Sequence, residues 1–406
     1  MSFQTGLSGL NAASRNLDVI GNNIANAQTV GAKVSRAEFA EVVAASTIGM
    51  AGRNEGIGVE VSTISQQFAQ GTVEITGNNL DLAINGGGFF RVTMPDGTPA
   101  YSRNGQFKLD TKGNIVTNQG ANVMGYPTMP DGVRTGVTLQ PMQVPTSTPI
   151  PAKATTAVAA EFNLDSKAAV WNSTVPPTPL TTYGTSITNY DSQGAPIATS
   201  MYMRKTANDT WELFTDPTSA ATATSSLTAT LTFGTNGKLV SSVPATPTIN
   251  VTSPNPAIGT FAPTLDLSTS TQFATAFSVT KLTQDGYAPG EFIALKINEQ
   301  GVVTANYSNG ESQAAGQIAL ADFRNVQGLR PSGGNNWVET AQSGQPVYGS
   351  PTESKFGALR AGAVEESNID LTSELVNMMT AQRSYQANAQ TIKVQDQVLS
   401  TLTNLR

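Results

Sequence analysis

The sequence predicts a mainly β protein with α-helical termini, in which nested β domains separate N- and C-terminal helices that pair as a coiled coil. Two observations predict this organisation. Both ends carry apolar residues at alternating four- and three-residue steps, which is the period of a coiled-coil seam. The long middle of the chain consists of short apolar runs separated by turn signals, which is typical of β-strands.

Narrow apolar stripes mark the two ends of the chain. The stripe of the N-terminal helix consists of Phe3, Leu7, Leu10, Leu17 and Ile24. The stripe of the C-terminal helix consists of Leu371, Leu375, Met378, Tyr385, Ile392, Leu399 and Leu402. Because both follow the a/d spacing, we expect these residues to make the contacts of helix pairing and polymerisation.

The alternative is that each helix packs separately onto its own globular domain. The N-terminal helix is interrupted by Gly6, Gly9 and Gly21. Glycine weakens a helix interior, so this helix is best stabilised by pairing with the other terminus and with neighbouring subunits. The C-terminal helix has a favourable start, because Asp370 or Thr372 can cap it and Glu374 stands where a capping-box partner would.

Between the helices we expect two β domains, one inserted into the other. Turn signals at 95–98, 111–114 and 118–120 separate short strands of the first domain, and a similar cadence returns after about residue 285. The intervening part is rich in Ser, Thr and Pro, but runs such as TWELF and LTATLTF still alternate, which favours a β domain over a flexible stalk. The expected domains are a helical domain (1–24 with 371–406), polar irregular connecting segments (25–70 with 358–370), a middle β domain (71–145 with 285–357) and an inserted outer β domain (146–284).

The stretch NNLDLAINGGGFF, residues 78–90, superficially resembles a phosphate-binding loop. Such a loop needs its glycines to close a strand and open a helix, whose N-terminus then faces the phosphate. Here the glycines are followed by a strand-like run and a Pro-Asp-Gly turn. We therefore interpret Gly86, Gly87 and Gly88 as a structural turn between two strands, expect positive φ values from Asn85 to Gly88, and expect Phe89 or Phe90 to be buried.

Composition excludes several classes of function. The 406 residues include no His and no Cys, so nucleophilic chemistry that needs either residue and zinc sites of the Cys/His type are impossible. The net charge of −6 argues against nucleic-acid binding. The segment 110–114 lacks the spacing of a calcium loop. We expect no catalytic residues, no cofactor and no metal, and we find neither a membrane-length apolar run nor a cleaved signal peptide.

Three stretches together resemble the axial proteins of the bacterial flagellum, the rod and hook proteins. They are SGLNAASRNLDVIGNNIANAQTVGAK near the start, NLDLAINGGGFF with the following YSRNGQFKLDTKGNIVTNQGANVMGYP, and SNIDLTSELVNMMTAQRSYQANAQTIKVQDQVLSTLTNLR at the end. The segment 146–284 matches in position and length rather than by motif. Because rod subunits are shorter, this insertion favours a hook-type member over a rod-type one.

The resemblance implies export through the flagellar type III apparatus without signal cleavage, followed by polymerisation into a curved, flexible tube, the universal joint that transmits torque from rod to filament. The implied partners are further copies of the chain, the rod and hook–filament junction proteins, and a hook cap during assembly. It also implies that the terminal helices form the inner tube, the middle β domain the next shell and the inserted domain the outer surface. No nucleic acid and no membrane insertion are implied.

One position departs from the family pattern, because Ala32 stands where many members have an aromatic residue. Subunit cross-linking through cysteine, which some relatives use, is impossible here. A secreted glycan-binding or glycosidase module is the alternative from another class. It would need clustered aromatic residues, yet Trp171, Trp211 and Trp337 are scattered, and it does not explain heptads at both termini.

Overall fold

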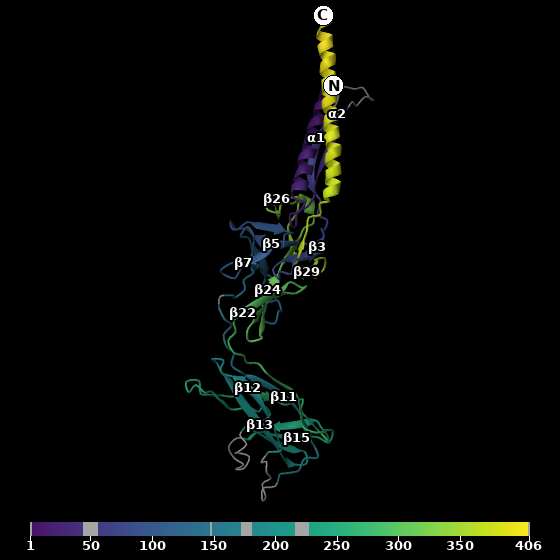
Figure 1. Cartoon of the computed structure of the whole chain (residues 1–406). Coiled ribbons are helices and arrows are strands. Elements are labelled where there is room, and N and C mark those ends of the chain that lie inside the picture. The colour runs from purple at the N-terminus through teal and green to yellow at the C-terminus, as the bar shows by residue number, and fades with distance from the viewer. Residues whose placement is uncertain (1, 44–55, 147, 172–180, 216–226, 405–406) are drawn as a thin grey trace. The chain divides into compact units, whose positions relative to one another are not determined.

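The computed structural model describes residues 2–43, 56–146, 148–171, 181–215 and 227–404. The chain divides into two compact units: unit 1 contains Met1–Ser147, Ala294–Asn306 and Ser312–Arg406, and unit 2 contains Thr148–Ile293 and Tyr307–Glu311. Helix α1 spans Ser2–Ala25 and helix α2 spans Leu371–Asn404. In the described chain between them the regular structure is β-strand, apart from a 3-10 turn, η2, at Val326–Gly328. The predicted fold class, mainly β with terminal helices that pack together, is confirmed (Figure 1).

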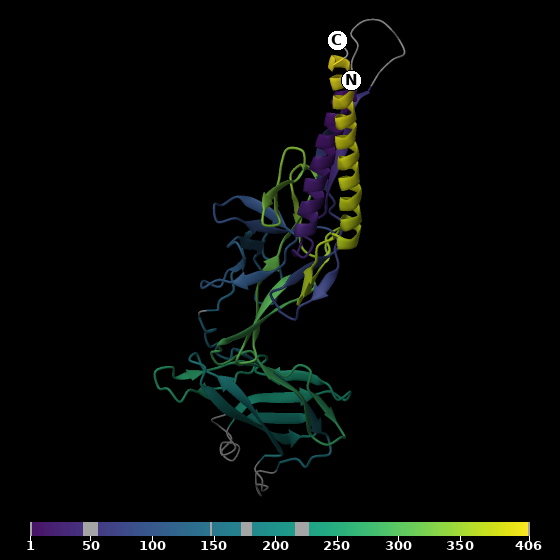
Figure 2. The same cartoon turned by 45° about the horizontal axis from the view of Figure 1, so that its top comes forward.

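In unit 1, helix α1 packs against two neighbours. One is α2, which lies beside α1 over most of its length (Figure 1; Figure 2). The other is an antiparallel hairpin of β1 (Ser35–Val43) and β2 (Gly56–Gln66). The contact with the hairpin includes a hydrogen bond of 3.3 Å from the backbone N–H of Val59 to Oγ of Ser8.

This hairpin differs from the expectation that residues 25–70 are irregular. Its strands do carry apolar residues at alternate positions, such as Ala37 and Phe39 in β1 and Val59 and Val61 in β2, and the expectation overlooked this strand signal. The hairpin is stabilised by packing on α1, where Ala37 is buried. The hairpin therefore agrees both with its local strand pattern and with its contact with α1.

Most strands of unit 1 belong to a 13-stranded sheet whose main path is β22-β23-β24-β9-β5-β6-β27-β26. The turns predicted at 95–98, 111–114 and 118–120 join β5 to β6, β7 to β8 and β8 to β9. A core cluster on this sheet contains Phe89, Tyr101, Ala321, Phe323, Leu329 and Trp337. The strands are β5 (Phe89–Thr93), β6 (Pro99–Ser102), β7 (Phe107–Leu109), β8 (Ile115–Thr117), β9 (Asn122–Tyr126), β10 (Gln140–Pro141), β22 (Phe292–Ile297), β23 (Val302–Tyr307), β24 (Ser312–Ile318), β25 (Leu320–Asp322), β26 (Arg330–Gly333), β27 (Asn336–Val338) and β28 (Val347–Gly349).

Two short strand pairs connect the segment after the β1–β2 hairpin with the segment before α2. Strand β3 (Val73–Ile75) pairs antiparallel with β30 (Ala363–Glu365). Strand β4 (Leu82–Asn85) pairs antiparallel with β29 (Ala358–Ala361). The segment that follows the β1–β2 hairpin therefore lies beside the segment that leads into α2.

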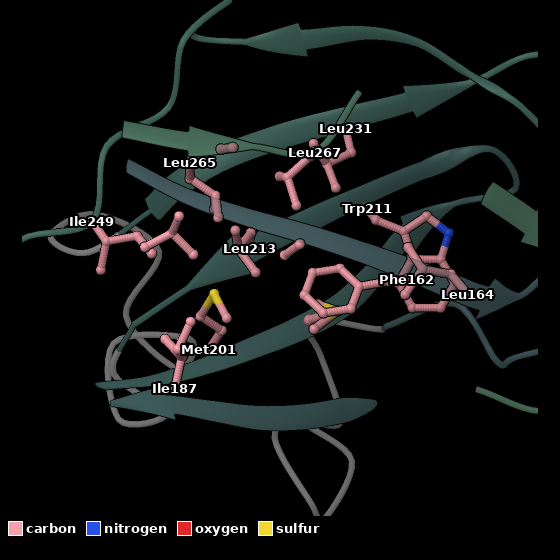
Figure 3. Packing of buried hydrophobic residues seen from close by; sticks show 14 of the residues in the cluster. Phe162, Leu164, Ile187, Met201, Trp211, Leu213, Leu231, Ile249, Leu265 and Leu267 are labelled. Atoms are coloured by element: carbon pink, nitrogen blue, oxygen red, sulfur yellow. The ribbon is translucent and has the colours of Figure 1, made fainter. Parts of the chain in front are cut away.

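Unit 2 is a β domain with two larger sheets and one two-stranded sheet. The first sheet is centred on β11, which pairs with β19, β20 and β21, the second has the order β12-β13-β14-β15-β16, and β17 pairs with β18. On β11 alternate residues, among them Phe162 and Leu164, are buried, and they share one core cluster with Trp211 and Leu213 of the other sheet. Figure 3 shows Phe162 and Leu164 near Trp211. The strands are β11 (Ala157–Asp165), β12 (Tyr183–Tyr190), β13 (Pro196–Ala207), β14 (Thr210–Phe214), β15 (Leu227–Phe233), β16 (Leu239–Val243), β17 (Val251–Thr252), β18 (Thr260–Phe261), β19 (Thr264–Asp266), β20 (Thr271–Phe273) and β21 (Ser278–Gln284).

Candidate functional site

The residues that the sequence marks as functional lie on the two terminal helices and in the glycine turn of unit 1. Within the described ranges, no group of three or more acidic side chains is arranged to hold a metal ion. No helix in the described part of the chain is long and apolar enough to cross a membrane.

The helices α1 and α2 approach each other through small residues. A Cβ atom added at Gly6 would lie 3.2 Å from Cγ1 of Ile392, and one added at Gly9 would lie 2.9 Å from Nδ2 of Asn388. Near the other end of α1, the buried Asn23 donates a hydrogen bond of 3.2 Å to Oε2 of Glu374. The order of these contacts makes the pair antiparallel. The glycines that weaken α1 as an isolated helix also allow α2 to come close.

The apolar stripe of α1 that the sequence marks is not the surface that α1 buries within its own chain. Phe3 is 46% exposed and Leu7 is 44% exposed. Leu10, Leu17 and Ile24 are only half-buried. The buried apolar residues of α1 are instead Ala12, Ala13, Val19 and Ile20.

On α2 the residues nearest α1 form a row that the apolar stripe only partly predicts. Contacts or burial place Glu374, Ala381, Asn388 and Ile392 in this row; only Ile392 belongs to the predicted stripe, and sequence reasoning missed the others because they are polar or small. Of the remaining predicted residues, Met378 is half-buried and Tyr385 is 37% exposed. The predicted residues Leu371, Leu375 and Leu399 are 41%, 50% and 53% exposed. Leu402 belongs to the helix, but its side chain lies outside the described residues.

Helix α2 also carries exposed apolar residues beside the predicted stripe. Val376 and Met379 are exposed near its start, and Val394 and Val398 are exposed nearer its end. Their spacing of three and four residues is a second helical signal that the sequence contains. The helix pair therefore exposes apolar surface on both members.

The start of α2 follows its predicted cap only in part. Oδ1 of Asp370 accepts the backbone N–H of Thr372 at 2.9 Å, as an N-cap residue does. Glu374 is buried and accepts a hydrogen bond from Asn23 of α1. The same Asn23 exchanges hydrogen bonds with the backbone of Ser35 at the start of β1, so a single amide contacts α2 and the hairpin.

The glycine turn joins two strands that belong to different sheets. Strand β4 pairs with β29, whereas β5 pairs with β6, β9 and β25, so the turn does not close a hairpin. Gly86 and Gly88 have φ values of 123° and 113°, which only glycine adopts readily. The expected positive φ is wrong at Asn85, which is still part of the extended strand β4, and at Gly87. The strand begins immediately afterwards with Phe89 and Phe90, which are 2% and 0% exposed.

Comparison with known proteins assigns the chain to a family. Four family models match it along its length: a flagella basal body rod protein model over residues 3–33, the flagellar hook protein FlgE/F/G D1 domain over 83–158, the flagellar basal body protein FlaE D2 domain over 163–287 and the flagellar basal body rod FlgEFG protein C-terminal model over 360–405. These matches include both terminal helices and parts of both units.

Relatives match over the whole chain. The flagellar hook protein FlgE of Salmonella typhimurium is 43% identical over 423 aligned residues, and that of Escherichia coli is 42% identical over 420; each comparison covers 100% of both chains. The crystal structure of the Helicobacter pylori flagellar hook protein FlgE2 has a TM-score of 0.52 at 16% identity, covers 71% of this chain and 99% of that chain, and shows the similarity of fold. The chain therefore belongs to the flagellar hook protein family, a structural protein family of the bacterial flagellum.

Proposed function

We propose that the chain polymerises through its terminal helices into the flagellar hook, a curved and flexible tube that transmits torque from the rod to the filament. The observation that carries this proposal is the apolar surface left exposed on α1 and α2, which includes Phe3, Leu7 and Leu375. A helix pair that exposes such residues on both members is suited to bury them against further copies.

The family resemblance supports a layered arrangement of the domains in the tube. The helical pair (1–24 with 371–406) forms the inner tube, the middle β domain (71–145 with 285–357) surrounds it, and the inserted domain (146–284) faces outward. Segments 25–70 and 358–370 connect the first two layers. The division of the chain into unit 1 and unit 2 supports a separate inserted domain, and its contact-based limits of Thr148–Ile293 with Tyr307–Glu311 are close to those expected.

The partners in this scheme are other copies of the chain, the rod, the hook–filament junction proteins, the hook cap and the type III export apparatus. The family resemblance supports them, and we assign the chain a structural role and no catalytic one. The full-length matches to hook proteins favour the hook over a rod-type function.

Polymerisation through the helices is tested by Leu7→Asp, which puts a charge on a residue that is 44% exposed in the single chain. Burying one leucine contributes about 1.5–3 kcal/mol, so we expect the critical concentration for tube formation to rise at least about tenfold. Electron microscopy and sedimentation measure this. Val240→Asp, on an exposed residue of unit 2, is the matched control and should retain tube formation. Normal tubes from Leu7→Asp at the wild-type critical concentration would contradict the proposal.

Flexibility is proposed to depend on the inserted domain. Residues 146–284 are rich in Ser, Thr and Pro and sparsely charged. Water-mediated contacts between such surfaces on neighbouring subunits can slide as the tube bends, because few strong ion pairs must break. Deleting the domain should give a tube of altered curvature or stiffness, as measured by electron microscopy; a normally curved and flexible tube would refute this role.

A further inference from the structure

Three buried charged side chains meet where the two ends of the chain join the middle β domain. Oε1 of Glu365 lies 2.6 Å from Nζ of Lys33, and Oε2 of Glu365 lies 3.1 Å from Nη1 of Arg103. The side chains of Glu365 and Lys33 are 0% exposed, and that of Arg103 is 6% exposed. Lys33 follows α1, Glu365 ends β30 just before α2, and Arg103 follows β6 of the large sheet.

Backbone groups complete this cluster. The N–H of Gly71 donates to Oε1 of Glu365 at 2.9 Å, and the N–H of Gly31 donates to the main-chain oxygen of Glu365 at 2.8 Å. Nζ of Lys33 also donates to the carbonyl of Ala69 at 2.8 Å. One carboxylate therefore contacts the chain that leaves α1, the chain that enters β3 and the large sheet.

The arginine extends the cluster to the glycine turn. Nη2 of Arg103 donates to the carbonyl of Gly86 at 3.0 Å, and its guanidinium lies 5.2 Å from the ring centroid of Phe89. Gly31 is required for the close approach, because with φ of 72° an added Cβ would lie 2.6 Å from the backbone nitrogen of Asn104.

We propose that Glu365, Lys33 and Arg103 form a buried charged clasp that fixes both terminal helices to the middle β domain. The clasp holds the segments on either side of the helices in one arrangement, so that force applied to the helices reaches the sheet. The force-transmitting role rests on the proposed function, whereas the clasp itself is a property of the single chain.

The charge balance predicts an asymmetry between the partners. The clasp contains two cations and one anion, so removing Glu365 leaves two buried cations without a counter-charge. Removing one partner of a buried ion pair is strongly destabilising because the remaining charge stays desolvated. Removing Lys33 leaves the Arg103–Glu365 pair intact. Burial lowers the pKa of Lys33 despite its hydrogen bond to Glu365, so desolvation offsets part of what this ion pair contributes.

Hydrogen exchange of the unpolymerised full chain tests the clasp. In Glu365→Gln we expect the amides of Gly31 and Gly71 to exchange at least about 100-fold faster, whereas Lys33→Met should change them less than about tenfold. The double variant Lys33→Met/Glu365→Gln has one uncompensated cation fewer and should regain part of the lost protection. Asp322→Asn, which removes an ion pair to the exposed Lys355, is the control and should leave these amides unchanged.

Unchanged exchange in Glu365→Gln, or equal effects of Glu365→Gln and Lys33→Met, would overturn the clasp. Loss of protection in Glu365→Gln throughout unit 1, with no recovery in the double variant, would also overturn it, since the effect would then be global rather than local. Because exchange is measured without polymerisation, these results do not depend on tube formation. The mechanical role is tested separately in swimming cells: normal speed with Glu365→Gln hooks that show the fast exchange would overturn force transmission through the clasp.

Discussion

The contact between α1 and α2 can be tested by comparing two glycines of the same helix. An added Cβ at Gly21 has no described atom within 4 Å, whereas at Gly9 it would lie 2.9–3.1 Å from the side-chain atoms of Asn388. Replacing Gly by Ala in a helix interior stabilises the helix by about 1 kcal/mol. At Gly21 this gain should appear in full.

At Gly9 the same gain is opposed by crowding. Inserting a methyl group into a tightly packed contact costs about 1–3 kcal/mol, so Gly9→Ala should range from neutral to about 2 kcal/mol destabilising. Asn388→Ala removes the atoms that the new methyl group would meet. In that background Gly9→Ala should recover the stabilising effect of about 1 kcal/mol.

Hydrogen exchange of the α1 amides in the full chain measures both changes. Gly21→Ala should slow exchange about fivefold, and Gly9→Ala should leave it unchanged or accelerate it. The double variant Gly9→Ala/Asn388→Ala should exchange more slowly than Asn388→Ala alone. If Gly9→Ala slowed exchange as much as Gly21→Ala, the close approach at Asn388 would be refuted for the protein in solution.

Three further predictions concern unit 2 and the chain ends. Trp211→Ala should destabilise unit 2 by about 3–5 kcal/mol in denaturant titrations, because the buried indole stacks on Tyr183 at 5.8 Å and donates to Gln272 at 3.0 Å; a loss below about 1 kcal/mol would contradict this packing. Burial alone would raise the pKa of Asp285, but hydrogen bonds from Thr156, the N–H of Ala157 and Lys153 hold that pKa well below its usual range. The ionised Asp285 therefore stabilises unit 2 above pH about 3.9, and this stabilisation is lost as pH falls towards the folded-state pKa. Asp285→Asn should make the melting temperature of unit 2 depend less on pH in the acid range. An unchanged pH dependence of the melting temperature would contradict this role of Asp285. Limited proteolysis of the unpolymerised chain should trim both helices and leave a β core, since each exposes much of its apolar stripe; full protection of residues 2–25 would argue the reverse.

Features that depend on local pattern could be predicted from the sequence. The helical period of Leu371, Met378 and Tyr385 indicates a terminal helix, and Asp370 marks its start. Turn signals such as 95–98 lie between strands because their backbone geometry depends on a few neighbouring residues. The strand-like run after Gly88 could also be recognised locally, and it excludes a phosphate loop because such a loop is followed by a helix.

The choice between helix faces was decided only by the tertiary structure. A period of alternating three and four residues identifies an apolar face, but it does not say whether that face meets the same chain or another copy. Helix α1 is covered by α2 and by the β1–β2 hairpin, and it buries small residues such as Ala13 while Phe3 and Leu7 stay exposed. The amides and small residues that α2 directs towards α1 carry no apolar signal, so sequence periodicity could not select them.

Polar contacts between residues far apart in the sequence could not be predicted either. The sequence shows Lys33, Arg103 and Glu365 as ordinary charged residues, separated by 332 positions for the lysine–glutamate pair and 262 for the arginine–glutamate pair. The return of the chain beside its own start brings them together through the β3–β30 pairing. Composition and local periodicity thus determined which segments become helix or strand, while the closure of the chain on itself determined which faces and charges are buried, because burial depends on contacts that no local window contains.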